Sequence, residues 1–183
     1  MTGSLVGSLL VSTPALLDPT FRRTLVLLLD HDEDGALGVV LNRPTEVPVA
    51  DVLPVWASHV SAPDVVFLGG PVAEDSALGV ARAPADPPVG WRRLNGSLGL
   101  VDLDAPPEVL APGVAGLRIY VGYSGWGAGQ LEGELAESAW WVFPAGPDDV
   151  FSPEPGRLWR NVLRRQGGGP ALAATLPDDP SLN

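Results

Sequence analysis

The chain lacks cysteine and lysine entirely and contains only two histidines. Without cysteine there is no disulfide bond, no cysteine nucleophile, no thiol redox chemistry and no zinc–thiolate site. Without lysine there is no Schiff-base chemistry and no phosphate-binding P-loop lysine. His31 and His59 are too few to build a metal cluster without carboxylates. The sequence therefore predicts no bound cofactor and no metal site.

Positive charge is also scarce, because 11 arginines face 22 acidic residues in the 183-residue chain, which gives a net charge of −11. DNA affinity comes largely from neutralising phosphates, so this balance argues against direct nucleic-acid binding. Long hydrophobic runs are missing as well. The longest, residues 25–29, is far too short to span a membrane. The first ten residues carry no positive charge, unlike a signal peptide. We expect a cytoplasmic protein with no membrane association.

Apolar residues make up 45% of the chain, enough for a real core, and 22 glycines with 20 prolines predict many turns. The patterning predicts three helices, at residues 49–53, 126–138 and 156–166. It predicts a breaker-rich loop over residues 83–96 and a loose tail from residue 177. Strands are expected at residues 4–11, 24–30, 36–41, 65–68, 77–82, 97–101, 117–121, 140–143 and 171–176. Because strands outnumber helices and do not alternate with them, the fold class is α+β.

The acidic stretch from Asp30 to Gly35 resembles the start of an EF-hand loop, with aspartates at positions 1, 3 and 5 and glycine at position 6. Position 12 is Leu41 rather than the required glutamate, and the flanks are predicted strands. We therefore expect a solvated β-hairpin tip, in which Gly35 takes a positive φ. A weakly held divalent ion is the alternative.

A second motif, Gly122-Tyr123-Ser124-Gly125-Trp126, falls one glycine short of a nucleophile elbow. Both histidines precede Ser124, whereas in α/β-hydrolases the histidine follows the serine. The glycines at 125, 127 and 129 also miss the dinucleotide fingerprint, which would need glycine at position 130. These glycines are expected to form a strand-to-helix turn, and an anion site at the start of the helix is the alternative.

Four blocks together resemble the YqgE/AlgH family of bacterial proteins: PALLDPTFRRT (residues 14–24), GALGVVLNRP (35–44), FLGGPV (67–72) and YVGYSGWGAGQLEGEL (120–135). The resemblance covers roughly residues 5–165. It implies an α+β fold with a strand-rich, bifurcated sheet curled into a pseudo-barrel and a few flanking helices. We expect a single domain over residues 1–166 and a partly flexible extension over residues 167–183.

The resemblance implies a weak functional label, because members of this family are described as transcriptional regulators without agreed catalytic residues. Redox sensing through cysteine, considered for some relatives, cannot operate in a chain without cysteine. The low pI and the missing helix-turn-helix pattern favour an indirect regulator that acts through a small ligand or a protein partner.

The family blocks contain backbone-geometry residues and residues that can present polar or aromatic groups at a cleft. We identify one candidate ligand site, drawn from these blocks: Arg23, Asn42, Arg43, Gly70, Tyr123, Trp126 and Gln130. Two alternatives remain open. One is a hydrolase that uses carboxylates or Ser124. The other is a protein-interaction module that uses its acidic surface or the arginine face of residues 157–164.

Overall fold

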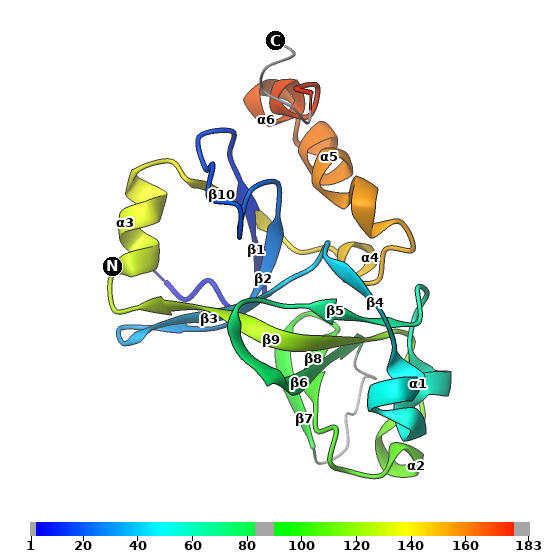
Figure 1. Cartoon of the computed structure of the whole chain (residues 1–183). Helices are drawn as coiled ribbons and strands as arrows, with labels where there is room; N and C mark the ends of the chain where they lie inside the picture. Colours follow the sequence, from blue (N-terminus) through cyan, green and yellow to red (C-terminus); the bar gives the residue numbers. More distant parts are fainter. Residues whose placement is uncertain (1–2, 83–89, 178–183) are drawn as a thin grey trace.

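The computed structural model describes residues 3–82 and 90–177 and has the expected α+β architecture (Figure 1). The strands are β1 (Ser8–Ser12), β2 (Leu25–Asp32), β3 (Gly35–Val40), β4 (Pro44–Pro48), β5 (Val65–Leu68), β6 (Val72–Arg82), β7 (Trp91–Asn95), β8 (Leu98–Val101), β9 (Leu117–Gly127) and β10 (Trp140–Pro144). The helices are α1 (Val49–Val52), the 3-10 helix η1 (Pro54–His59), α2 (Pro107–Leu110), α3 (Gln130–Ala136), α4 (Pro147–Val150), α5 (Pro155–Gln166) and α6 (Gly168–Ala173).

The strands form one curled sheet in the order β10-β1-β2-β3-β9-β6-β8-β7, and all neighbours on this path are antiparallel. The long strand β9 is the branch point. Its last four residues pair with β3, whereas its first half pairs with β6 and also runs parallel to β5, which in turn pairs with β4. This branching is the bifurcated sheet expected from the family resemblance.

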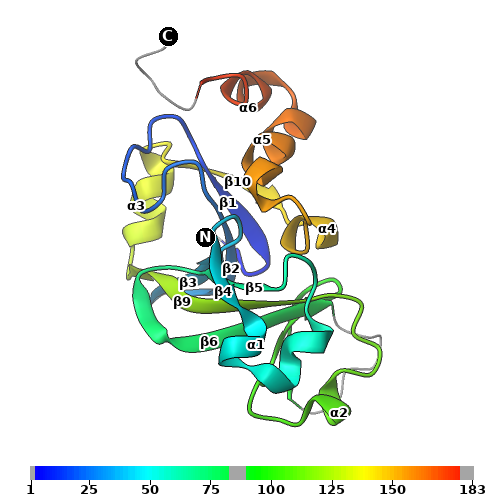
Figure 2. The same ribbon diagram turned by 45° about the vertical axis from the view of Figure 1, so that its right-hand side comes forward.

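Strand β2 explains how the two halves of the core are arranged. Successive side chains of a strand point to opposite faces. Leu25, Leu27 and Leu29 accordingly pack into one cluster with α5, whereas Val26 and Leu28 pack into another with α3. Figures 1 and 2 show these two helices on opposite sides of β1 and β2. Burial on both faces is why β2 is an uninterrupted apolar run rather than an alternating one.

The β2–β3 hairpin confirms the interpretation of the acidic stretch as a strand–turn–strand unit. Strand β2 ends at Asp32 and β3 begins at Gly35, which has φ +140°. The predicted strands at 65–68 and 97–101 and the helices at 49–53 and 156–166 are likewise confirmed within a few residues. Among the described residues, no helix is both long and apolar enough to cross a membrane.

Three expectations about local structure are wrong. The helix expected from Trp126 begins at Gln130, because residues 122–127 continue β9 instead of turning. Residues 91–95, expected within a loop, form β7 as the partner of β8, while residues 83–89 lie outside the described part. Residues 171–176, expected as a strand, belong to α6 and the turns after it, where Ala173 and Ala174 are buried in the α5 cluster. The division at residue 166 stays a prediction.

Candidate functional site

The connection between β1 and β2, which we call the 13–23 segment, is held by the side chain of Asn42. The Asn42 amide donates a hydrogen bond to the Arg23 carbonyl (2.8 Å) and accepts one from the Leu25 N–H (3.2 Å). The nitrogen and the oxygen of the amide are therefore both hydrogen-bonded to backbone groups. The candidate ligand residue Asn42 acts here as a brace for the segment.

Arg43 also holds this segment, through a hydrogen bond to its backbone. Its Nη2 donates to the Pro19 carbonyl at 2.9 Å. Burial lowers the pKa of Arg43, and the nearby Asp18 carboxylate partly opposes that shift. Asn42 and Arg43 thus lie next to each other in sequence and hold this segment at its C-terminal end and at Pro19. Neither residue lines the two clefts beside the segment.

Gly70 and Tyr123 meet where the chain leaves β5 and passes β9. A Cβ atom on Gly70 would lie 2.2 Å from the Tyr123 carbonyl carbon, so only glycine fits this crossing. Tyr123 pairs with Val72, and its ring packs against the core cluster that contains Leu25 and the buried side of α5. The structure brings Gly70 and Tyr123 together, but as a backbone crossing rather than as part of a cleft.

Arg23 is the last residue of the 13–23 segment and has φ +55°. Its guanidinium is 4.9 Å from the centre of the Trp159 ring and donates to the carbonyls of Leu176 and Pro177. This arrangement forms a mainly apolar cleft of about 160 Å³, the α5 cleft. Its walls are Thr13, Pro14, Leu16, Leu17, Arg22, Arg23, Trp159, Leu176 and Pro177.

Trp126 and Gln130 line a second and larger cleft of about 370 Å³, the α3 cleft, on the other side of the segment. These two lining residues were predicted from the family blocks, whereas the carboxylates beside them were not. The walls are Ala15, Leu16, Asp18, Phe21, Gly125, Trp126, Gln130, Glu134, Glu137 and Ala139. Gln130 and Glu134 are four residues apart on a helix, and this spacing could have predicted a shared face.

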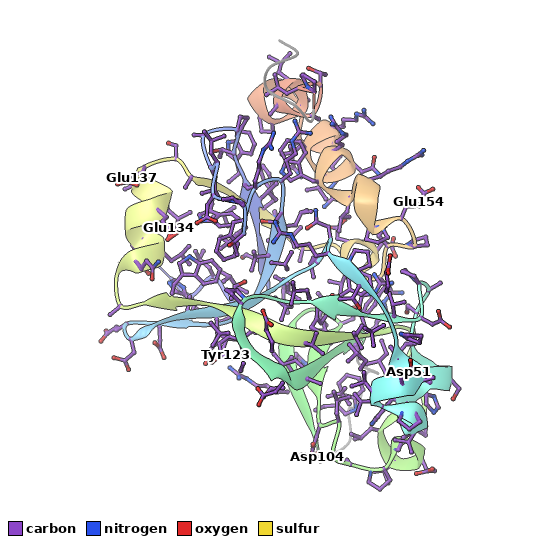
Figure 3. All side chains as sticks on the ribbon, viewed as in Figure 1. Asp51, Asp104, Tyr123, Glu134, Glu137 and Glu154 are labelled. Carbon is purple, nitrogen blue, oxygen red and sulfur yellow. The ribbon has the colours of Figure 1, made fainter. Side chains whose placement is uncertain are left out.

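Glu134 is the most constrained side chain of the α3 cleft. Its Oε1 accepts hydrogen bonds from the indole N–H groups of Trp126 (3.3 Å) and Trp140 (3.1 Å). Both tryptophans are at least 95% buried, and Phe21 packs on both rings with centroid distances of 6.0 and 5.7 Å. Figure 3 shows Glu134 on the side of α3 that faces the strands and Glu137 at the end of the helix. The aromatic cluster therefore fixes one carboxylate in place.

Two carboxylates of the cleft, those of Glu134 and Glu137, have no basic partner in the described part of the chain. In the described part of the chain, neither Glu134 nor Glu137 has a basic nitrogen within 4 Å, and no arginine or histidine lines the cleft. By contrast, the buried carboxylate of Asp149 binds both terminal nitrogens of Arg165 at 2.6 Å. Both indoles bind Oε1 of Glu134, and no described hydrogen bond involves Oε2.

Ser124 does not offer a nucleophile. Its side chain is fully buried, and Oγ donates a hydrogen bond to the Gly69 carbonyl at 3.0 Å. The Gly122–Trp126 motif lies within β9, not at a strand-to-helix elbow. Of the two versions of the hydrolase alternative, the one that uses Ser124 therefore loses its nucleophile, and the one that uses carboxylates stays a prediction.

The acidic hairpin tip forms an ordinary turn. Asp32 accepts a hydrogen bond from the Asp34 N–H at 2.8 Å, and Asp30 lies 3.7 Å from Arg92. No group of three or more His, Asp or Glu side chains within residues 3–82 and 90–177 is arranged to hold a metal ion.

A family model described as AlgH-like matches residues 9–171. The chain belongs to the AlgH-like family. A UPF0301 protein of Streptomyces coelicolor is 63% identical over 185 residues, which cover 98% of this chain and 96% of that one. A UPF0301 protein of Mycobacterium tuberculosis is 50% identical over 181 residues, covering 97% and 90%.

Two solved structures of this AlgH-like fold extend the comparison. A protein from Corynebacterium diphtheriae superposes with a TM-score of 0.90 at 32% identity, covering 96% of this chain and 94% of that one. The solution structure of AlgH from Pseudomonas aeruginosa gives a TM-score of 0.72 at 28% identity, covering 98% and 97%. The AlgH-like assignment thus rests on sequence and on fold.

Proposed function

We propose that this AlgH-like protein is a cytoplasmic regulator that responds to a small ligand bound in the α3 cleft and does not contact DNA directly. The observation that carries the proposal is Glu134, a carboxylate fixed by two buried indoles at the wall of a cleft of about 370 Å³. Ligand sites typically combine apolar and aromatic walls with a few positioned polar groups. The α3 cleft has that composition.

The charge of the cleft favours a ligand with a positively charged group. Asp18 and Glu137 add two carboxylates to that of Glu134, and no basic side chain among the described residues lines the walls. An ammonium or guanidinium group that bonds Oε2 of Glu134 gains a charge-assisted hydrogen bond without reorganising the carboxylate. Gln130 adds an amide for a neutral polar group, although its Oε1 already accepts from the Gly127 N–H (3.0 Å). An organic cation, rather than an anion or a nucleic acid, is the matching chemistry.

The charge of the whole chain supports a regulator that does not contact DNA. A net charge of −11 repels the phosphate backbone, which supplies most of non-specific DNA affinity. A ligand-dependent change passed to a protein partner is consistent with both the charge and the cleft. We expect no DNA binding at physiological ionic strength in an electrophoretic mobility assay.

A thermal-shift screen tests the proposal with primary amines, guanidinium compounds and, for comparison, organic anions. A ligand present at about a hundred times its Kd stabilises by about 2.7 kcal/mol, or about 5–10 °C for a chain of this size. We expect a shift of this kind from cations only. The Glu134→Gln variant removes the fixed charge with little change in shape, and it should abolish the shift.

Asp51→Asn is the matched control. Asp51 is an exposed acid on α1, far from α3 in Figure 3, and its removal changes the net charge by the same amount. The cation shift should persist in this variant. Equal loss of the shift in both variants would indicate general charge attraction and refute the site. A flat screen would instead favour a protein-interaction module.

A further inference from the structure

His31 of β2 is bonded through both of its ring nitrogens. Its side chain is only 6% exposed. Nδ1 accepts a hydrogen bond from the backbone N–H of Leu5 at 3.0 Å, and Nε2 lies 2.7 Å from Oε1 of Glu132 on α3. The ring therefore joins the segment before β1 to α3.

These two contacts fix the protonation state of the ring. A backbone N–H only donates, so Nδ1 must present its lone pair to Leu5. The single ring proton of neutral His31 then resides on Nε2, from which it is donated to the Glu132 carboxylate. The structure thus assigns the neutral Nε2–H tautomer. A doubly protonated ring would bring two N–H groups face to face at 3.0 Å.

The Leu5 contact is part of what ties residues 3–7 to the sheet. Ser4 Oγ donates to the His31 carbonyl at 3.4 Å, and the Gly7 N–H donates to the Leu28 carbonyl at 2.8 Å. The Leu5 side chain is partly buried against the cluster on the α3 side of β2. Without the Nδ1 contact, one long hydrogen bond from Ser4 and the partly buried Leu5 side chain are what still hold residues 4 and 5 to the sheet. The other bonds of these two residues are local, from the Ser8 N–H to the Leu5 carbonyl (2.9 Å) and from the Val6 N–H to Ser4 Oγ (3.3 Å).

We propose that His31 is a pH-sensitive latch: a proton taken from solvent onto Nδ1 breaks the Leu5 contact and releases residues 3–6, while the ring stays paired with Glu132. This device is independent of the ligand proposed for the α3 cleft. It adds a response to acidification at a place where no ligand is needed.

Most charged groups around the His31 ring are carboxylates, which favour its protonation. No basic side chain in the described part of the chain contacts the ring. The titratable or charged groups on the packed elements are Glu132 from α3, Asp30, Asp32 and Glu33 from the β2–β3 hairpin, and Arg92 from β7. Ser4 and Leu5 bring no charge from the N-terminal side. The hydrogen bond with His31 lowers the pKa of Glu132, so this carboxylate stays ionised over the range in which histidines ordinarily titrate. Arg92 is held 3.7 Å from Asp30 rather than on the ring.

Nitrogen-15 NMR of the full chain tests the latch directly. At about pH 8 the ring should show the Nε2–H tautomer, and at about pH 5 both ring nitrogens should be protonated. Across the same change, hydrogen exchange of the Leu5 amide, corrected for intrinsic rates, should accelerate at least about tenfold, the scale of losing one hydrogen bond. The Leu27 amide in the centre of β2 should keep its protection.

Three variants make the outcome decisive. In His31→Asn, the side-chain oxygen takes the place of Nδ1 without titrating, so the pH response of the Leu5 amide should vanish. In Glu132→Gln the anion is lost, so release should require more acid. His59→Asn, at the other histidine, should behave as the parent chain. An Nδ1–H tautomer at the higher pH, unchanged Leu5 protection, or a response that survives in His31→Asn would each overturn the latch.

Discussion

Replacing Arg118 with methionine is expected to lower the free energy of unfolding by about 3 kcal/mol. Arg118 lies on β9 and is 1% exposed. Its guanidinium donates to the carbonyls of Val150 (2.9 Å) and Ser152 (3.1 Å) at the end of α4 and to that of Ala62 (2.5 Å) from a second segment. No carboxylate of the described chain lies within ion-pair distance, so neutral carbonyls alone hold this buried cation.

The magnitude follows from two opposing contributions. Methionine leaves three carbonyls without their donor, at about 1–3 kcal/mol each where water cannot reach them. It also removes the stacking of the guanidinium 4.4 Å from the Phe67 ring centre. In the other direction, the methionine variant avoids the cost of burying a charge, which is several kcal/mol. Burial of the Arg118 guanidinium lowers its pKa, which shows that this cost is present in the parent chain. The balance, about 3 kcal/mol, corresponds to a fall in Tm of about 6–12 °C.

Urea unfolding followed by tryptophan fluorescence, with thermal melts as a second measurement, checks this value. Arg157→Met is the matched control, because the Arg157 side chain is 75% exposed and lies 3.9 Å from Glu154. Its effect should stay within about 0.5 kcal/mol. Arg118→Lys should fall between the two, since one ammonium group cannot reproduce the planar fork. Equal unfolding midpoints for the two methionine variants would refute the reasoning.

Three further predictions concern the other buried contacts. Ser124→Ala should cost about 1 kcal/mol in urea unfolding, because it removes one of the two hydrogen bonds that the Gly69 carbonyl accepts, the other coming from the Val40 N–H, and a fluorophosphonate probe should label neither protein. Gly70→Ala should reduce the yield of folded protein and lower Tm by more than about 10 °C, because the new Cβ would lie 2.2 Å from backbone. Glu132 has a lowered pKa because of His31, so its stabilisation is present above its ordinary value of 4.5 and is lost as pH falls through the lowered one. Since its side chain is 40% exposed, Glu132→Gln should cost less than about 1 kcal/mol near neutral pH, and melts at decreasing pH should show this difference disappear.

Local pattern was enough to predict the strands and helices whose signals lie within a few residues. The apolar run of β2, with polar residues after it and Gly35 beyond, predicted both a buried strand and a hairpin. The same reasoning failed for residues 122–127, where three glycines indicated a turn. In the fold Gly122, Gly125 and Gly127 lie within β9. Gly122 is so close to Gly70 that a Cβ atom added to Gly122 would lie 2.4 Å from the Gly70 oxygen. That requirement comes from residues about fifty positions away, which local pattern does not contain.

The candidate site was predicted in part, for a related reason. Trp126 and Gln130 line the α3 cleft, whereas Asn42 and Arg43 hold the 13–23 segment and Arg23 faces the α5 cleft. Polar residue type and position in a family block do not distinguish a side chain that binds backbone from one that faces a cleft. Only the tertiary partners make that distinction.

The 13–23 segment is the element that relates these residues to one another. Leu16 lines both clefts, so the segment is a shared wall between them. Phe21 fixes one side of this wall against Trp126, and Asn42 and Arg43 fix its backbone. A ligand that displaced the wall from the α3 side would therefore alter the α5 side as well. Asn42 and Arg43 lie in neither cleft lining, yet their substitution should change both clefts through this wall.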